Sequence, residues 1–209
     1  MILDTYHFLT IKQCAPLTPS FTPSAGGNVA TAYVLLVRRK DGIRSLAQLA
    51  KHTIEIGTRG VQVMPRIWLD TVLAQNRLAP ASTLFRSVGR AQNAGKAILN
   101  VLFGSTTACV VPQRAFSGAA ELNPQVGQQL TALKTSVPYV EEFVFFSPHC
   151  PQDRATAIRS AALALHTKAR GRQLMALFGV VKMVPFQKTQ LRTARDLVRT
   201  YQAYRSAGR

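Results

Sequence analysis

The 209-residue chain has 26 lysine and arginine residues against 9 aspartate and glutamate residues, a net charge of +17. Its 47% apolar content is enough for hydrophobic cores, and no apolar run reaches the ~18 residues that a membrane-spanning helix needs. The charge favours acidic partners such as nucleic acids, anionic lipids or small anions. The basic residues are scattered and form no aromatic-basic stripe, so we expect no specific nucleic-acid recognition.

The first forty residues predict one short helix and one strong strand. The helix is expected over 4–13, and an extended segment and loop are expected over 16–28, where Pro, Ser, Thr and Gly gather. Residues 32–37 are apolar throughout, which is typical of a parallel strand covered on both faces. The opening residues lack the basic and apolar regions of a secretion signal.

The stretch from His52 to Leu73 is the most informative part of the chain. It predicts a strand over 53–56, a glycine-bounded turn over 57–60 and a helix over 61–73, with Pro65 in its first turn. The free N–H groups and positive dipole at a helix start can hold an anion after such a turn. An ordinary connection between a strand and a helix is the alternative.

Strands and helices alternate at short intervals from Ser45 to Thr135, which indicates an α/β domain with a mostly parallel sheet. The expected strands beyond the opening stretch are 82–88, 107–111 and an edge strand over 130–135, and the expected helices are 46–51, 89–103 and 116–122, with a turn or short helix over 124–129. The last third predicts a strand over 140–146 and helices over 152–166, 169–178 and 190–204.

Residues for catalysis or metal binding show no recognisable spacing. Cys14, Cys109 and Cys150 form no CxxC pair, and the four histidines lie far apart in the sequence. We therefore expect no enzyme activity, no cofactor and no metal site. Polar donors are instead expected at or just past the carboxyl ends of parallel strands, where α/β sheets bind ligands; they are Thr58, Arg59, Ser87, Arg90, Gln113 and Arg114.

Several segments in order resemble the phosphate/phosphite/phosphonate-type periplasmic substrate-binding proteins of ABC transporters. Residues 33–57 are similar to that family's YxSxLVVRxDSGIxSLADLKGKxIAF pattern, and Pro65-Arg66 matches a pair in its next helix. Further similarities are Ala97–Val111 to its AxLxVLxGxADAxxV segment, Glu121–Pro124 to its ELNP, and Ala176–Pro185 to its ALGxxGFxP. The resemblance extends from about Thr5 to Tyr201.

The resemblance implies a type-2 periplasmic-binding-protein-like α/β fold, in which two lobes are joined by two crossing strands and close on a ligand by hinge motion. It divides the chain into 1–40 (partial first lobe and crossing strand), 41–139 (second lobe) and 140–209 (return strand and first-lobe helices). The first lobe is expected to be incomplete, because the family's secretion signal and leading βαβα unit have no counterpart here. Periplasmic location follows from the resemblance, and cytoplasmic location follows if the start is genuine.

The resemblance also implies a ligand and the residues that hold it. We expect a small phosphorus oxyanion delivered to an ABC transporter permease, with Thr58 and the backbone of Arg59, Gly60 and Val61 holding its oxygens. Arg59 and Arg90 would neutralise charge, Tyr6 would close over the ligand, and Ser87 and Gln113 would complete the site. Two alternatives remain: a degenerate or sensor relative without a transport role, and a basic protein that binds nucleic acid or an anionic surface.

Overall fold

The computed structural model describes residues 2–11, 17, 19–57 and 63–207. The chain divides into two compact units. Unit 1 comprises Met1–Ala30 and Tyr139–Arg195, and unit 2 comprises Thr31–Pro138 and Asp196–Arg209.

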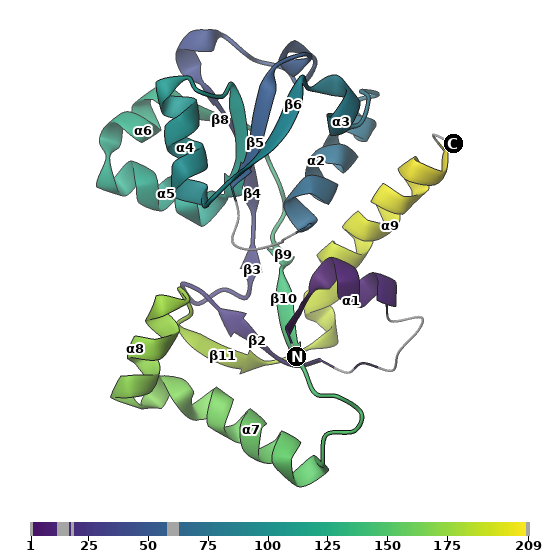
Figure 1. Cartoon of the computed structure of the whole chain (residues 1–209), viewed down its shortest axis with the longest axis vertical. Coiled ribbons are helices and arrows are strands. Elements are labelled where there is room, and N and C mark those ends of the chain that lie inside the picture. The colour runs from purple at the N-terminus through teal and green to yellow at the C-terminus, as the bar shows by residue number, and fades with distance from the viewer. Residues whose placement is uncertain (1, 12–16, 18, 58–62, 208–209) are drawn as a thin grey trace. The chain divides into compact units, whose positions relative to one another are not determined.

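Unit 1 contains a four-stranded antiparallel sheet in the order β1-β10-β2-β11. Figure 1 labels its elements. They are β1 (Ile2–Asp4), α1 (Thr5–Ile11), β2 (Pro19–Ser24), β10 (Glu142–Phe145), α7 (Gln152–Ala164), α8 (Ala169–Leu177) and β11 (Lys182–Pro185), with 3-10 turns η3 (Leu165–Thr167) and η4 (Lys188–Leu191).

The core of unit 1 is built from aromatic side chains on α1 and β10. Phe8 lies against Phe145 with ring centroids 5.0 Å apart, and Phe143 meets Phe186 edge-on at 5.2 Å. Thr5, at the start of α1, donates through Oγ1 to the Val140 carbonyl at 2.6 Å. This contact fixes the first turn of α1, the helix that carries Tyr6.

Strand β2 lies within the extended segment and loop expected over 16–28 and is paired inside a sheet. Its sequence PSFTPS carries two prolines, yet it lies inside the sheet between β10 and β11. Phe21 is buried in the unit, and the Thr22 hydroxyl donates to the Glu142 carbonyl at 2.8 Å. Tertiary burial and hydroxyl hydrogen bonding therefore override a composition typical of loops.

Unit 2 contains a five-stranded sheet with helices on both faces (Figure 1). Its strands are β4 (Tyr33–Arg38), β5 (Thr53–Gly57), β6 (Ser87–Ala91), β7 (Ala108–Pro112) and β8 (Leu130–Thr135). Its helices are α2 (Met64–Gln75), α3 (Ala81–Leu84), α4 (Ala94–Phe103), α5 (Gln113–Leu122) and α6 (Pro124–Gln129), with 3-10 turns η1 (Arg39–Asp41) and η2 (Ala47–Leu49).

The strand order in unit 2 is β6-β5-β7-β4-β8, with β8 at an edge as expected. Strands β5, β6 and β7 are parallel, whereas β4 runs antiparallel to both of its neighbours. Residues 32–37 are expected to be covered on both faces, as parallel strands are, and β4 is indeed buried on both faces but runs antiparallel. The apolar sequence of β4 reflects its burial on both faces. Such burial does not depend on the direction of the strand.

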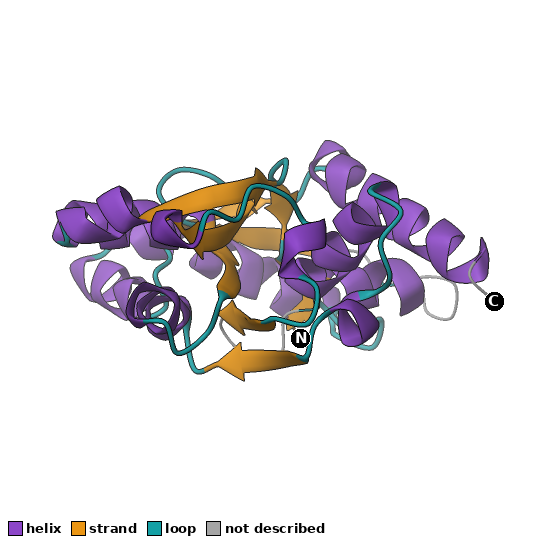
Figure 2. Ribbon diagram, turned by 90° about the horizontal axis from the view of Figure 1, so that it is seen from above, coloured by secondary structure: helices purple, strands orange, loops and turns teal. Residues whose placement is uncertain are grey.

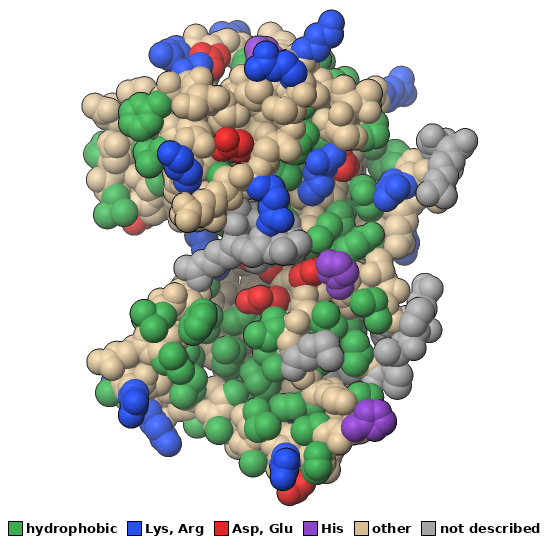
Figure 3. Space-filling view, viewed as in Figure 1, with side chains coloured by type: hydrophobic (Ala, Val, Ile, Leu, Met, Phe, Trp, Pro, Cys, Tyr) green, Lys and Arg blue, Asp and Glu red, His purple; other side chains and the backbone are tan. Residues whose placement is uncertain are grey.

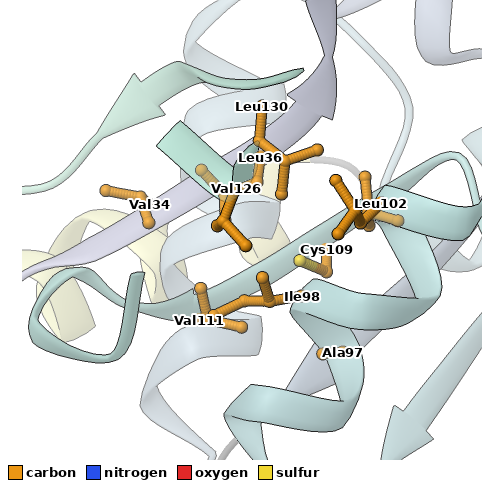
Figure 4. Packing of buried hydrophobic residues seen from close by; sticks show 10 residues of the cluster. Val34, Leu36, Ala97, Ile98, Leu102, Cys109, Val111, Val126 and Leu130 are labelled. Atoms are coloured by element: carbon orange, nitrogen blue, oxygen red, sulfur yellow. The ribbon is translucent and has the colours of Figure 1, made fainter. Parts of the chain in front are cut away.

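The side chains of β4 alternate between two hydrophobic layers. Val34 and Leu36 pack with α4, α5 and α6, and Figure 4 shows this cluster. On the other face Tyr33 lies 6.1 Å from the Trp68 ring of α2, measured between ring centroids. Figure 2 shows the helices and strands of the chain in a second view. Unit 2 is thus a three-layer α/β arrangement.

Two expected elements of unit 2 are displaced. Residues 82–88, expected as a strand, contain the end of α3 and only the start of β6. The helix expected over 89–103 begins at Ala94, because Gly89 to Ala91 complete β6 beside β5. The expected helix over 46–51 is the short 3-10 turn η2.

The unit limits differ from the three expected segments at two places. Strand β4 lies within the sheet of unit 2, so this unit begins at Thr31 rather than at residue 41. Helix α9 (Arg192–Ala207) starts in unit 1 and continues in unit 2 from Asp196. The short strands β3 (Ala30–Thr31) and β9 (Tyr139–Val140) lie where the chain passes from one unit to the other.

Candidate functional site: the carboxyl edge of the unit 2 sheet

Three parallel strands of unit 2 end at the same edge of the sheet. Gly57 of β5 pairs with Ala91 of β6, and Ile56 pairs with Val110 of β7. Each strand is followed in the chain by a helix, namely α2, α4 and α5. The carboxyl edge therefore gathers three helix starts, whose N–H groups and dipoles favour a negatively charged ligand.

Gly57 lies directly against the first turn of α4. A Cβ built on Gly57 would lie 2.5 Å from Ala97 Cβ, 3.0 Å from Ala94 Cα and 3.1 Å from the Asn93 carbonyl oxygen. Only glycine allows this approach, because any side chain would collide with helix backbone. The end of β5 and the start of α4 are thereby held together as one rigid corner of the site.

The start of α4 is capped by Asn93. Its side-chain oxygen accepts a hydrogen bond from the Lys96 amide at 2.9 Å. The cap satisfies one first-turn donor, while the Ala94 and Gly95 amides have no acceptor within the helix. Asn93 falls inside the helix expected over 89–103 and was not recognised as a cap, although an asparagine just ahead of an apolar helical pattern is a recognisable start signal.

The start of α5 follows β7 without a gap. The Gln113 amide donates to the Ala32 carbonyl at 2.8 Å, which ties this corner to the chain entering β4. Pro112 occupies the cap position and provides no side-chain acceptor. The Arg114 and Ala115 amides therefore lack a partner within the helix, as is general for a first turn. The side chains of Gln113 and Arg114 are exposed.

The charges of the described residues make this edge positive. Arg90, Lys96 and Arg114 lie in its strand ends and helix starts, and neither α4 nor α5 has an acidic residue in its first turn. Three carboxylates of unit 2 bond to side chains within unit 2 at other places; these are Asp41 with Arg38, Asp70 with Arg66, and Glu55 with Asn100. An anion at the edge thus meets donors and cations rather than carboxylates.

Not all of the expected site residues reach this edge. Arg90 is the fourth of five residues in β6, and Gln113 begins α5, so both lie at the carboxyl edge as expected. Ser87 is the first residue of β6 and pairs with Thr53, so it lies at the opposite end of the strand. Its expected position is wrong, because β6 begins where the sequence pattern suggested that a strand would end.

The other expected site residues are those of the predicted turn, Val61 and Tyr6. The turn residues Thr58, Arg59, Gly60 and Val61 lie outside the described residues. Tyr6 belongs to α1 of unit 1, where its ring meets the His7 ring edge-on at a centroid distance of 5.7 Å. The neighbouring Asp4 accepts a hydrogen bond from the His7 amide at 3.0 Å and also pairs with the His7 ring.

The other chemically notable groups are buried structural residues. Cys109 carries a free thiol inside unit 2, and burial, with a smaller contribution from the Glu55 charge, raises its pKa well above the ordinary range. Within the described ranges no three potential ligands from His, Cys, Asp and Glu gather at a metal-binding spacing. None of the helices in those ranges combines the length and apolarity needed to cross a membrane.

Comparison with known families finds one match over most of the chain. The family described as "ABC transporter, phosphonate, periplasmic substrate-binding protein" matches residues 1–191. A comparison with proteins of curated function finds no relative.

Solved structures share the fold at low sequence identity. A binding protein component of an ABC phosphonate transporter, PA3383 from Pseudomonas aeruginosa, has a TM-score of 0.73 and 15% identity over 100% of this chain and 70% of its own. XAC2383 from Xanthomonas citri bound to ATP has a TM-score of 0.73 and 16% identity over 98% and 78% of the chains. PhnD1 from Prochlorococcus marinus in complex with methylphosphonate has a TM-score of 0.69 and 13% identity, over 96% of this chain and 77% of its own. These likenesses confirm the predicted α/β class of type-2 periplasmic-binding-protein fold.

Proposed function

Since the chain belongs to the phosphonate periplasmic substrate-binding protein family of ABC transporters, we propose that it binds a small phosphorus oxyanion. Phosphate, phosphite and phosphonate are the ligand class. The observation that supports this proposal is the carboxyl edge of unit 2, where three helix starts meet with basic side chains and no carboxylate in the first turns of α4 and α5. The protein would act in the periplasm and deliver the anion to a permease, without catalysis.

We assign the anion contacts to three groups of residues. Thr58 and the backbone amides of Arg59, Gly60 and Val61 hold the oxygens at the start of α2, as the family resemblance implies. Arg90 supplies positive charge from β6, and Gln113 supplies its side-chain amide at the start of α5. Tyr6, on α1, is the further ligand residue that the family resemblance implies. Hydrogen bonds to a charged ligand contribute about 1.5–3 kcal/mol each, so a few of them give useful affinity.

Titration calorimetry with phosphate, phosphite and methylphosphonate tests the proposal. We expect heat of binding for at least one of these anions, and a fall in affinity of about tenfold or more for the Arg90→Gln variant. Arg86→Gln is a matched control, because Arg86 is an exposed arginine that precedes β6 at the other end of the strand. No heat with any anion, from protein with the circular dichroism of a folded α/β chain, would refute the proposal.

A further inference from the structure

Large apolar side chains are exposed where α8 ends and β11 begins in unit 1. Leu174 is 50% exposed, Leu177 77%, Phe178 63% and Val181 54%. Each of these side chains therefore leaves half or more of its surface open to solvent. Figure 3 shows hydrophobic side chains, in green, on the visible face of unit 1 over the position of α8. We call residues 174–181 the apolar turn.

Backbone hydrogen bonds hold the apolar turn in place. The Val180 amide donates to the Met175 carbonyl at 3.0 Å, and the Val181 amide donates to the Ser24 carbonyl of β2 at 2.7 Å. Gly179 provides the left-handed backbone, with φ of 63°, that ends the helix. Met175 is buried beneath the turn. The projecting side chains therefore stand on a fixed base.

The surroundings of the apolar turn are basic. Exposed Arg170 precedes Leu174 by one helical turn and so shares its face, and exposed Lys182 follows Val181 directly. Across the described residues 152–188 there is one acidic side chain, Asp153; the basic ones are Arg154, Arg159, Lys168, Arg170, Arg172, Lys182 and Lys188. A partner that covers this face must therefore offer negative charge around an apolar centre.

We propose that the apolar turn of unit 1 inserts into the surface of an anionic lipid membrane. Acyl chains accept projecting Leu, Phe and Val side chains without a complementary shape, and lipid phosphates pair with the flanking Lys and Arg residues. A polypeptide partner would instead need a preformed hollow to enclose side chains that project this far. The contact lies within unit 1 and does not depend on the oxyanion site of unit 2.

Vesicle sedimentation tests the proposal. We expect the chain to pellet with vesicles of 30% phosphatidylglycerol and 70% phosphatidylcholine, and to remain in the supernatant with phosphatidylcholine alone. Raising the salt concentration weakens the interaction, because it screens the basic side chains. The variant Leu174→Ser/Leu177→Ser/Val181→Ser lowers the partition coefficient about tenfold or more, because it removes the inserted groups while leaving the charge intact.

The matched control removes exposed apolar groups from unit 2. Leu99→Ser/Phe103→Ser/Leu122→Ser changes side chains of comparable exposure and leaves vesicle binding unchanged. Circular dichroism establishes that both variants fold. Three results would overturn the proposal: the first variant pellets with anionic vesicles as much as the unchanged chain, the chain binds pure phosphatidylcholine vesicles as well as anionic ones, or it does not bind anionic vesicles at all. Dimers that the first variant abolishes, without any vesicle binding, would show a second copy as the occupant and also overturn it.

Discussion

Each unit has a strand in the interior of its sheet, and the two strands have opposite chemistry. Strand β4 of unit 2 reads YVLLVR and buries an apolar side chain on each face in turn. Strand β2 of unit 1 reads PSFTPS and is equally surrounded, by β10 and β11. The comparison shows that an interior strand requires satisfied backbone and side-chain groups more than it requires an apolar sequence. In unit 2 the interior strand is stabilised by the packing of apolar side chains. In unit 1 it is stabilised by aromatic rings and by hydrogen bonds from hydroxyl groups.

The largest expected effect comes from removing an aromatic ring of unit 1. Phe143→Ala leaves a cavity between the Phe8, Phe145 and Phe186 rings and lowers the free energy of unfolding by about 3–5 kcal/mol. Hydrogen exchange read by mass spectrometry should show faster exchange in β1, β2 and β10. An equal increase in the exchange rate of β4 would contradict the comparison, because it would mean that the two units unfold cooperatively.

A smaller loss is expected at the corner of unit 2. Gly57→Ala places a methyl group 2.5 Å from Ala97 Cβ and lowers the free energy of unfolding by about 2 kcal/mol. Gly118→Ala in α5 is the control, since no atom lies within 4 Å of the added Cβ and alanine favours the helix. Urea unfolding compares the two variants. An unchanged midpoint for Gly57→Ala would show that the corner is not rigid.

High pH should lower the free energy of unfolding of each unit through the ionisation of a different side chain. Burial raises the pKa of Cys109 in unit 2 above its ordinary value and raises that of Tyr139 in unit 1 to about 12. Their stabilising effect is complete below the unfolded-state pKa and is lost as the pH rises toward the folded one. Stability should therefore fall by about 1 kcal/mol near pH 9.5 as the unfolded thiol ionises. Thermal unfolding measures this loss, and Cys109→Ala should abolish it until tyrosine begins to ionise.

The smallest expected effect tests the hydroxyl of β2. Thr22→Val keeps the side-chain shape but removes the hydrogen bond to the Glu142 carbonyl, which costs about 1 kcal/mol. Thr83→Val is a control at a more exposed threonine of α3. If guanidinium unfolding gives both variants the same midpoint, the hydroxyl does not replace hydrophobic packing in unit 1.

The same contrast explains how far the sequence predicts the structure. In unit 2 the buried strands are runs of apolar residues. The segments 32–37, 53–56 and 107–111 were therefore assigned to strands within one or two residues of their observed limits. Strand β11 was missed, and β2 was recognised only as part of an extended segment and loop, because Pro19, Pro23 and the short KMVP segment carry no periodic apolar signal. Their position depends on partners distant in sequence, which local patterns do not encode.

At the candidate site, residue types were easier to predict than geometry. Gln113 was recognised from its place after an apolar strand, whereas the turn predicted over 57–60 lies, beyond Gly57, outside the described residues. Ser87 was misplaced because Gly89 and Arg90 were assigned to a helix rather than to β6. The close packing of Gly57 on α4 depends on a pairing of β5 and β6 that no local pattern records.

The interrupted chain path of unit 1 has a consequence for synthesis on the ribosome. Strands β1 and β2 leave the ribosome before β10, which lies between them in the sheet and emerges only after the whole of Thr31–Pro138. The sheet of unit 2 comes from one continuous stretch and can assemble while translation continues. Nascent β1 and β2 therefore stay unpaired with β10 while unit 2 folds. A chaperone that shields short unpaired strands would raise the yield of unit 1 more than that of unit 2.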